Sequence, residues 1–573
     1  MTLVDAPDRA TAPAYDRPPG RARRIWGAPL WAHLAALSVI LVLVMPLAGT
    51  SASFSADEGA AIIQAQSLSD GEGWIVPHPV PEIDPEGRNY PLELSAEGDK
   101  GVAPFGKHPL YALLLAGADR LGGHVAMVLL SILGTVAAAG LAGAHARRIG
   151  PGLDRPAIWV VGLASPLLFD GYLVMGHTLA AALVAAAALA ALTAVERRRP
   201  LAALAVLVFV TLAVLLRTEA FVLGIALAVA AASTALRRPR WPGLLVAATA
   251  LAAAGGGRLL EGLWGRSLVG AASGTNASGA VGGESFLADK INAFALTWLR
   301  PGYGENGAVV EIALVIMAMA IVLAVWALRR DPGGRNGAVV LAAIAALSAV
   351  VALAAAPKNL VPGFLVAFPI GLAGLASLRT ATLRTLAARV LTITFVLFAA
   401  GVIATQYDRG GSGEWGGRYF ALGIPLLVPV VLLALRESAE GVARRSRQAL
   451  AAGLAVCSLS MAVMSVVSIR STHVFTDRLM TSIDQVSRNT GEERPLLVTT
   501  SPLMPRLAWK TFDDQRWLLS TPADLPSVVD RLRSAGVGRF TLVTRDLERD
   551  GGALWAEDNR KVGRWHILIV NGQ

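Results

Sequence analysis

Two adjacent carboxylates, Asp57 and Glu58, are the side chains of this sequence best placed for acid–base chemistry. They closely follow the first long apolar run, so they lie at a membrane surface. A carboxylate that is partly desolvated there can accept a proton from a hydroxyl group docked against it. The alternative is a structural role, because acidic residues also favour the first turn of a helix, and a helix is predicted over 56–68.

Three charged residues lie at the ends of later apolar runs. Lys107 is at the edge of a membrane-facing segment, where its ammonium group suits the phosphate of an anionic lipid. Snorkelling of that lysine to a lipid headgroup is the alternative. Arg217 and Glu219 share an outer turn, and such charges are expected to face the interior or mouth of a helix bundle. They form either an internal ion pair or, through Arg217, a phosphate contact.

Two further turns carry polar residues. Arg418 lies with Trp415 and Tyr419 before an inward-going apolar run. Its guanidinium could hold a phosphate through two parallel hydrogen bonds, or it could belong to an interfacial aromatic belt. Asp170 and His177 flank a short outer turn, and a lone histidine such as His177 near an apolar face is more often a packed structural residue.

The composition is that of a polytopic helical membrane protein. Of 573 residues, 54% are hydrophobic and 16% are charged. Apolar runs of about 17 to 25 residues recur, which is the length that spans a bilayer. Most of the net charge of +10 comes from arginine clusters between these runs. The positive-inside rule explains that charge better than nucleic-acid binding does. The single cysteine, Cys457, supports neither a disulfide framework nor a cysteine metal cluster.

The pattern predicts an all-α membrane bundle with a small C-terminal α/β domain. We expect a disordered cytoplasmic tail at 1–28, a membrane domain at 29–469 and an extracytoplasmic domain at 470–573. The hydropathy windows give about thirteen transmembrane helices, which puts the termini on opposite sides of the plasma membrane. The first outer loop is expected at 51–107 and another long outer loop at 266–306.

Periodicity predicts further elements in the loops and in the tail. The helix at 56–68 is expected to be amphipathic and to lie along the membrane surface. A short helix is expected at 108–121, before a separate span at 124–145, and another helix at 286–299. In the tail, the pattern predicts three strands and one helix, at 495–499, 540–544, 565–570 and 525–535.

The motifs in the first quarter of the chain resemble the GT-C superfamily of integral-membrane glycosyltransferases, specifically its protein mannosyltransferase and aminoarabinose-transferase branch. The chain reads FSADE at 54–58, GWIVP at 73–77 and KHPLY at 107–111. That branch reads Asp-Glu, then Gly-x-Trp-x-x-Pro, then Lys-Pro-Pro-Leu. His108 departs from the pattern, as does the longer spacing before Lys107. WGGRY at 415–419 also resembles a Trp-Gly-x-Arg-Tyr element of bacterial members.

The resemblance implies transfer of a sugar, with inversion, from a polyprenyl-phosphate carrier to an acceptor hydroxyl at the outer face of the membrane. It implies that Asp57 is the catalytic acid or base, that Lys107 contacts the donor phosphate, and that Asp170 is a second acid. This chemistry needs a base for the acceptor and fixed cations for the leaving phosphate. The candidate set is Asp57, Glu58 and Asp170 for catalysis, Lys107, Arg217 and Arg418 for the phosphate, and His108, His177, Glu219, Trp415 and Tyr419 for substrate contact.

The sequence calls for no cofactor. A divalent ion between Asp57 and the donor phosphate would suit the chemistry, but no cluster of acids and histidines has clear metal-ligand spacing. The acceptor can be a glycan, a glycolipid or a protein, and the sugar is equally open. The main alternative is a transporter or flippase of a lipid-linked glycan, although transporters place their charges near the bilayer midplane. A non-catalytic scaffold is the third interpretation, and it leaves the loop motifs unexplained.

Overall fold

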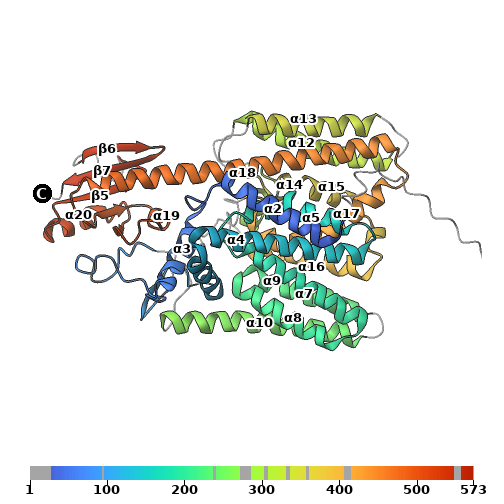
Figure 1. Cartoon of the computed structure of the whole chain (residues 1–573), viewed down its shortest axis with the longest axis horizontal. Coiled ribbons are helices and arrows are strands. Elements are labelled where there is room, and N and C mark those ends of the chain that lie inside the picture. Colours follow the sequence, from blue (N-terminus) through green and yellow to red (C-terminus); the bar gives the residue numbers. More distant parts are fainter. Residues whose placement is uncertain are drawn as a thin grey trace, which may run out of the picture.

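The structure is a computed structural model that describes residues 27–92, 96–106, 108–236, 240–270, 286–301, 307–330, 336–355, 360–405, 415–547 and 556–571. Most of the predicted tail at 1–28, part of the outer loop at 266–306 and the predicted phosphate ligand Lys107 lie outside the described residues. The molecule is elongated, with a helical bundle that carries a small sheet at one end (Figure 1).

Nine helices of the described chain are long and apolar enough to cross a membrane, so this is a multi-pass membrane protein. Two shorter apolar helices, α8 (Pro200–Leu216) and α9 (Glu219–Thr234), lie among them. The nine are α2 (Leu30–Ala48), α4 (Pro109–Ile149), α7 (His177–Arg197), α10 (Trp241–Val269), α12 (Ala308–Arg330), α13 (Gly337–Ala355), α16 (Leu386–Thr405), η3 (Arg418–Gly423) joined to α17 (Ile424–Ala439), and α18 (Arg444–Arg488).

Two of the predicted spans are each divided into two short helices. These are α5 (Asp154–Leu163) with α6 (Leu167–Asp170), and α14 (Phe364–Ala367) with α15 (Pro369–Ser377). Prolines lie at both breaks, and Pro166 and Pro369 lack the N–H group that would continue the preceding helix. The total of about thirteen spans therefore stays a prediction.

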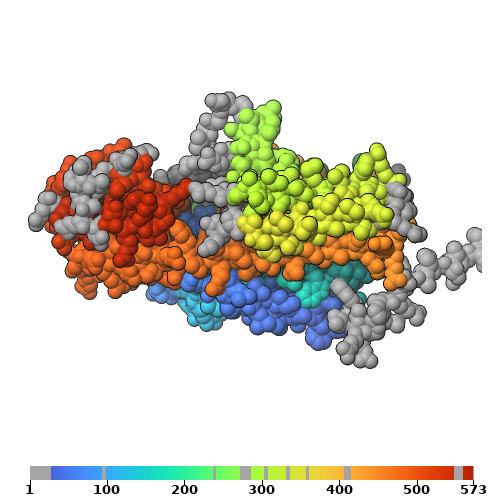
Figure 2. Space-filling view, turned by 90° about the horizontal axis from the view of Figure 1, so that it is seen from above, coloured from blue at the N-terminus to red at the C-terminus, as the bar shows by residue number. Residues whose placement is uncertain are grey.

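Two helices are longer than the sequence predicts. The expected helix at 108–121 and the span at 124–145 form one element, α4, which is kinked at Gly122 and Gly123. The 45-residue α18 runs through the predicted domain boundary at 469. Neither glycine nor proline occurs between Gly453 and Gly491, so nothing in the sequence breaks this helix at the membrane surface. Figure 2 shows α18 extending along the bundle into the C-terminal domain.

The C-terminal domain contains a five-stranded mixed sheet in the order β4-β3-β5-β7-β6. β3 is parallel to β4 and β5, whereas β7 is antiparallel to β5 and β6. The three predicted strands and the predicted helix are confirmed, and the sequence missed β4 and β6, which are short or mainly polar. The elements are β3 (Leu496–Thr499), β4 (Arg516–Leu519), α20 (Leu525–Ser534), β5 (Arg539–Thr544), β6 (Ala556–Val562) and β7 (Trp565–Asn571).

The loop elements differ from the prediction in their surroundings. α3 (Ala56–Ser69) is the expected helix, but most of its residues are buried. It packs against α4 and against α19 (Met504–Leu507) from the C-terminal domain. The C-terminal domain therefore covers part of this helix, and its position at the membrane surface stays a prediction. The expected helix at 286–299 is confirmed as α11 (Phe286–Phe294), which continues into η1 (Ala295–Leu299).

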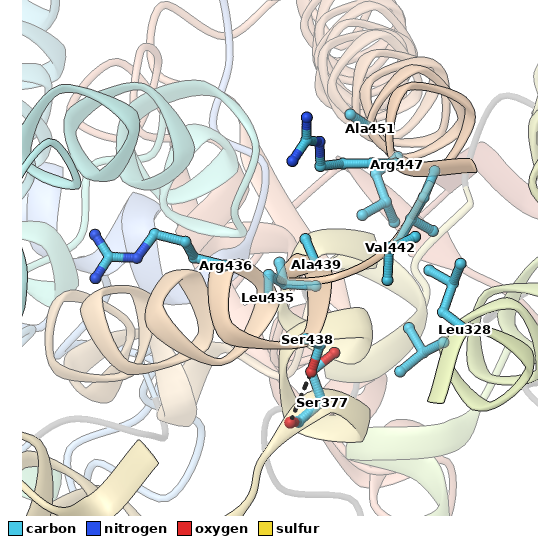
Figure 3. A pocket seen from close by; sticks show the side chains of 12 residues that line it. Leu328, Ser377, Leu435, Arg436, Ser438, Ala439, Val442, Arg447 and Ala451 are labelled. Atoms are coloured by element: carbon cyan, nitrogen blue, oxygen red, sulfur yellow. Dashed lines mark hydrogen bonds between the residues drawn. The ribbon is translucent and has the colours of Figure 1, made fainter. Parts of the chain in front are cut away.

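The helix ends farthest from the C-terminal domain carry many arginines, and we call this region the basic end. Arg436 donates a hydrogen bond to the carbonyl oxygen of Pro151 at 2.8 Å. A cavity of about 210 Å³ lies here, and its lining includes Arg436, Ser438 and Arg447 (Figure 3). Arginines in such numbers fit the cytoplasmic side, and that orientation stays a prediction. The arginines of the basic end are Arg147, Arg148, Arg197, Arg329, Arg330, Arg436, Arg444, Arg445 and Arg447.

Candidate active site

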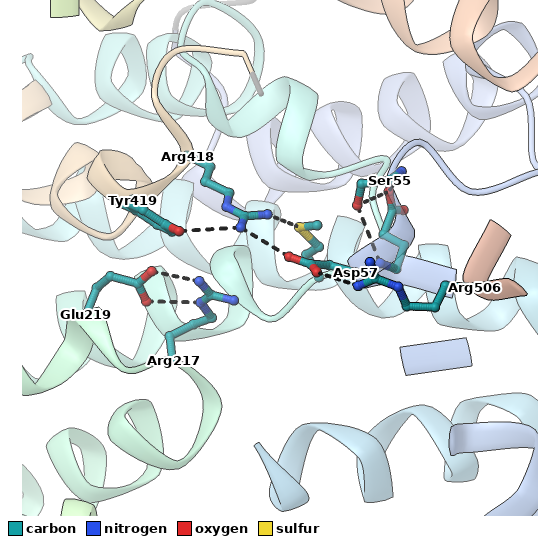
Figure 4. A network of polar contacts seen from close by, with 9 residues as sticks. Ser55, Asp57, Arg217, Glu219, Arg418, Tyr419 and Arg506 are labelled. Atoms are coloured by element: carbon teal, nitrogen blue, oxygen red, sulfur yellow. Dashed lines mark hydrogen bonds and ion pairs between the residues drawn. The ribbon is translucent and has the colours of Figure 1, made fainter. Parts of the chain in front are cut away.

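Asp57, the first acid of the predicted pair, lies in the first turn of α3 between two arginines from distant parts of the chain (Figure 4). Arg418 Nη2 is 3.2 Å from Asp57 Oδ2, and Arg506 Nη1 is 3.7 Å from Asp57 Oδ1. The Arg418 and Arg506 side chains are 11% and 2% exposed, whereas 28% of the Asp57 side chain is exposed. Asp57 is thus a carboxylate that a docked substrate can still reach, held by one buried and one partly buried cation.

Glu58 has a different environment from its neighbour. It forms a capping box with Ser55, in which each side chain bonds the backbone N–H of the other residue. Its second oxygen accepts a hydrogen bond from Val174 N at 2.8 Å, and only 1% of the residue is exposed. These contacts fix the start of α3 against the turn before α7, and a catalytic role for Glu58 stays a prediction.

The approach of Arg506 to Asp57 depends on a glycine in α3. A Cβ atom at Gly59 would lie 1.8 Å from the carbonyl oxygen of Arg506, so no larger residue fits there while α19 stays in place. The Arg506 side chain is oriented by a hydrogen bond from its Nε to the carbonyl oxygen of Pro502 at 2.9 Å. Sequence reasoning missed Arg506, because nothing in its local pattern indicates which distant helix it meets.

The predicted WGGRY element forms the turn that aims Arg418 at Asp57. Gly416 and Gly417 have φ values of 68° and 60°, in the left-handed region that favours glycine. Trp415 is 2% exposed and stacks on Phe169, with ring centroids 6.0 Å apart. This packing supports the turn, and the substrate contact predicted for Trp415 stays a prediction. Tyr419 lies beside the guanidinium, with its hydroxyl 3.5 Å from Arg418 Nη2.

Arg217 and Glu219 form the ion pair that was one of their two predicted roles. The guanidinium Nε and Nη2 atoms lie 3.1 and 2.7 Å from the two carboxylate oxygens of Glu219. Their side chains are 11% and 13% exposed, and they lie close to the Arg418–Asp57 pair in Figure 4. The bidentate geometry satisfies both groups, so a phosphate contact through Arg217 would require the pair to rearrange.

His108 is buried against an acid that the sequence did not indicate. Its Nδ1 lies 2.7 Å from Glu261 Oε1, and both side chains are less than 5% exposed. Arg258 also pairs with Glu261, one turn earlier in α10. This pairing attaches the start of α4 to α10, and the substrate contact predicted for His108 stays a prediction. Lys107, the preceding residue, lies outside the described residues, and its role stays a prediction.

Asp170 and His177 lie at the two ends of the turn that contacts Glu58. Asp170 ends α6 and His177 begins α7, and both residues are 0% exposed. Their burial differs from the outer-surface position that the sequence indicated for them. A catalytic role for Asp170 and a substrate contact for His177 stay predictions.

An apolar cavity of about 330 Å³ lies beside the element that carries Arg418. Its lining includes Trp298 and Phe395 and comes mainly from α11, η1, α15, α16 and α17. Trp298 also packs edge-on against Phe420 of η3, with centroids 5.0 Å apart. Phe420 follows Arg418 by two residues in η3. The element that carries Arg418 therefore contacts the wall of this cavity, through the packing of Phe420 on Trp298.

The arrangement can bind an anion beside a base. Arg418 can exchange a carboxylate for a phosphate, because both present paired oxygens to its planar fork. Within the described ranges of the chain, no group of three or more histidine, cysteine, aspartate or glutamate residues could hold a metal ion.

No protein-family model and no curated protein matches the sequence. Two solved structures of ArnT from Cupriavidus metallidurans are similar in fold. The apo structure is 15% identical, with 95% of this chain and 99% of that chain covered and a TM-score of 0.46. The structure bound to undecaprenyl phosphate is 16% identical, with 94% and 98% covered and a TM-score of 0.45.

The archaeal oligosaccharyltransferase AglB from Archaeoglobus fulgidus, in complex with an inhibitory peptide and a dolichol-phosphate, is 10% identical to this chain. The similarity covers 90% of this chain and 70% of AglB, with a TM-score of 0.45.

Proposed function

We propose that this protein is an inverting glycosyltransferase that moves a sugar from a polyprenyl-phosphate carrier to an acceptor hydroxyl at the outer face of the plasma membrane. The observation that carries this proposal is a reachable carboxylate, Asp57, held by the largely buried guanidinium of Arg418. The element that carries Arg418 also contacts the wall of an apolar cavity, through Phe420 and Trp298. Asp57 can serve as the base, Arg418 can bind the phosphate, and the cavity can hold the lipid chain in such a reaction.

In the proposed reaction, the donor phosphate takes the place of Asp57 as the partner of Arg418. The acceptor oxygen attacks the anomeric carbon, and the bond from that carbon to the phosphate oxygen breaks with its electron pair on the phosphate. Asp57, released from Arg418, takes the proton of the acceptor hydroxyl. Arg418, together with Lys107, stabilises the charge on the leaving phosphate.

The lipid chain of the donor lies in the apolar cavity lined by Trp298 and Phe395 in this proposal. Burial of isoprene units there contributes affinity at about 0.8 kcal/mol for each CH₂ group removed from water. This part of the carrier is remote from the reacting bond, so it supports binding and orientation and leaves the chemistry to Asp57.

The test is complementation of a deletion strain with wild-type, Asp57→Asn and Asp530→Asn genes, followed by mass spectrometry of lipids and envelope glycans. Asp530 is a matched control, because it is 75% exposed on α20, away from the site. We expect the deletion strain to accumulate a polyprenyl-phosphate sugar and to lack one glycan linkage. Wild type and Asp530→Asn restore the linkage, and Asp57→Asn does not, at equal levels of protein in the membrane.

Two results would count against this function. Restoration of the linkage by Asp57→Asn would remove Asp57 as the base. A deletion strain that accumulates its lipid-linked sugar on the cytoplasmic leaflet only, with Asp57→Asn fully competent, would indicate a flippase instead.

A further inference from the structure

We propose that Arg506, from the C-terminal domain, is a positioning residue for Asp57, so that the reaction depends on the docking of that domain on α3. This inference rests on the proposed role of Asp57 as the base. The C-terminal domain then has a part in catalysis even if the acceptor never touches its sheet.

The two arginines around Asp57 occupy different oxygens of its carboxylate. Arg418 approaches Oδ2 and Arg506 approaches Oδ1. A phosphate that binds Arg418 would therefore remove one partner of Asp57 and leave the other. Arg506 keeps the carboxylate oriented during that exchange, and its positive charge favours the ionised form that a base requires.

Arg506 is held in place by its own side-chain and backbone contacts. Its side chain is 2% exposed, its Nε bonds the carbonyl oxygen of Pro502, and its own carbonyl sits against Gly59 of α3. Three residues further on, Trp509 stacks on His124 of α4, with ring centroids 5.0 Å apart at 26°. These contacts anchor the segment around α19 to both α3 and α4, so the guanidinium has a fixed position relative to Asp57.

The experiment compares full-length wild type with Arg506→Met and Arg506→Lys, using the polyprenyl-phosphate sugar that accumulates in the deletion strain as donor. We expect Arg506→Met to lower kcat about 10- to 100-fold, the scale of a misplaced catalytic group. KM for the donor should change less than about twofold, because Arg506 is not the proposed phosphate ligand. Binding of undecaprenyl phosphate, measured separately, should be unchanged.

A pH profile separates positioning from a merely structural role. Removal of a positive charge beside Asp57 favours its protonated form, so the acidic limb of kcat/KM should move to higher pH by about one unit in Arg506→Met. Arg506→Lys restores the charge without the planar fork, and we expect it to recover the pH profile more fully than kcat.

A second pair of variants tests domain docking without touching Arg506. Gly59→Ala places a Cβ atom where the Arg506 carbonyl lies, whereas Gly117→Ala in α4 meets nothing within 4 Å and serves as the control. We expect Gly59→Ala to lower kcat as Arg506→Met does, and Gly117→Ala to match wild type.

A normal kcat in Arg506→Met, or a lowered kcat with an unmoved acidic limb, would overturn this role of Arg506. If Asp57→Asn is inactive in the same assay, the proposed function stands while this inference fails. If Asp57→Asn is fully active, the proposed function itself fails.

Discussion

Arginines occur at both ends of the bundle, but their surroundings differ. At the end that carries the candidate active site, which we call the site end, three arginine side chains are at most 11% exposed. Arg217 faces the carboxylate of Glu219, and Arg418 and Arg506 face that of Asp57. At the basic end, Arg147 pairs with Asp154 while 60% of its side chain is exposed. Burial of a charge is costly unless it is paired, whereas an exposed charge is nearly free. The charges around Asp57 are therefore placed at an energetic cost, which points to function. The exposed arginines of the basic end carry little such cost, and their predicted role is to set the orientation in the membrane.

The strongest test of this difference is Arg418→Ala. We expect kcat/KM to fall by about 10²- to 10³-fold, the usual effect of removing one donor to a developing negative charge. Binding of undecaprenyl phosphate should weaken in parallel. Arg418→Lys should recover little, because an ammonium group lacks the two-pronged geometry. Unchanged affinity in Arg418→Ala would end the assignment of Arg418 to the phosphate.

A smaller effect is expected in the apolar cavity. Ala399 is a buried lining residue of this cavity, and Ala399→Phe fills part of it. We expect KM for a long-chain donor to rise about tenfold, as for loss of roughly two buried CH₂ groups, and KM for a short-chain analogue to stay the same. Ala404→Phe, at an exposed position on the same helix, is the control. An equal rise of KM for both chain lengths would contradict the placement of the lipid chain.

The smallest effect is expected at the basic end. Arg447 is exposed at the rim of the cavity in Figure 3, and Arg447→Ala should leave kcat/KM within about twofold of wild type, as is usual for surface substitutions. Orientation should also hold, because many other arginines share that end. A tenfold loss of activity would show that the two ends do not divide their roles as described.

Much of the fold follows from the sequence because apolar run length and periodicity are local signals. The long helices, three strands of the sheet and the helix at 56–68 were predicted in this way. The environment of that helix was not predictable, since the segment that covers it, α19, comes from the other end of the chain. The continuation of α18 beyond 467 was missed because loss of hydropathy ends a span but does not end a helix.

The candidate site was predictable only in part. The motifs indicated Asp57 and Arg418, and the structure brings them together. Glu58 carries the same charge as Asp57, and only the structure shows that Glu58 caps α3 through Ser55 and contacts Val174. Arg506 and Glu261 were missed, because each pairs with a residue far away in the sequence. Such a pairing produces no local sequence pattern around either partner.

The unbroken length of α18 has a mechanical consequence. At about 1.5 Å per residue its 45 residues form a rod roughly 68 Å long. The sheet follows directly after this rod, so the length and direction of α18 fix the distance and orientation of the sheet relative to the bundle. Inserting one residue in the middle of α18 would rotate the C-terminal domain about the helix axis by roughly 100°. In related chains, the length of this helix can therefore change only by whole helical turns if the sheet is to keep the same neighbours.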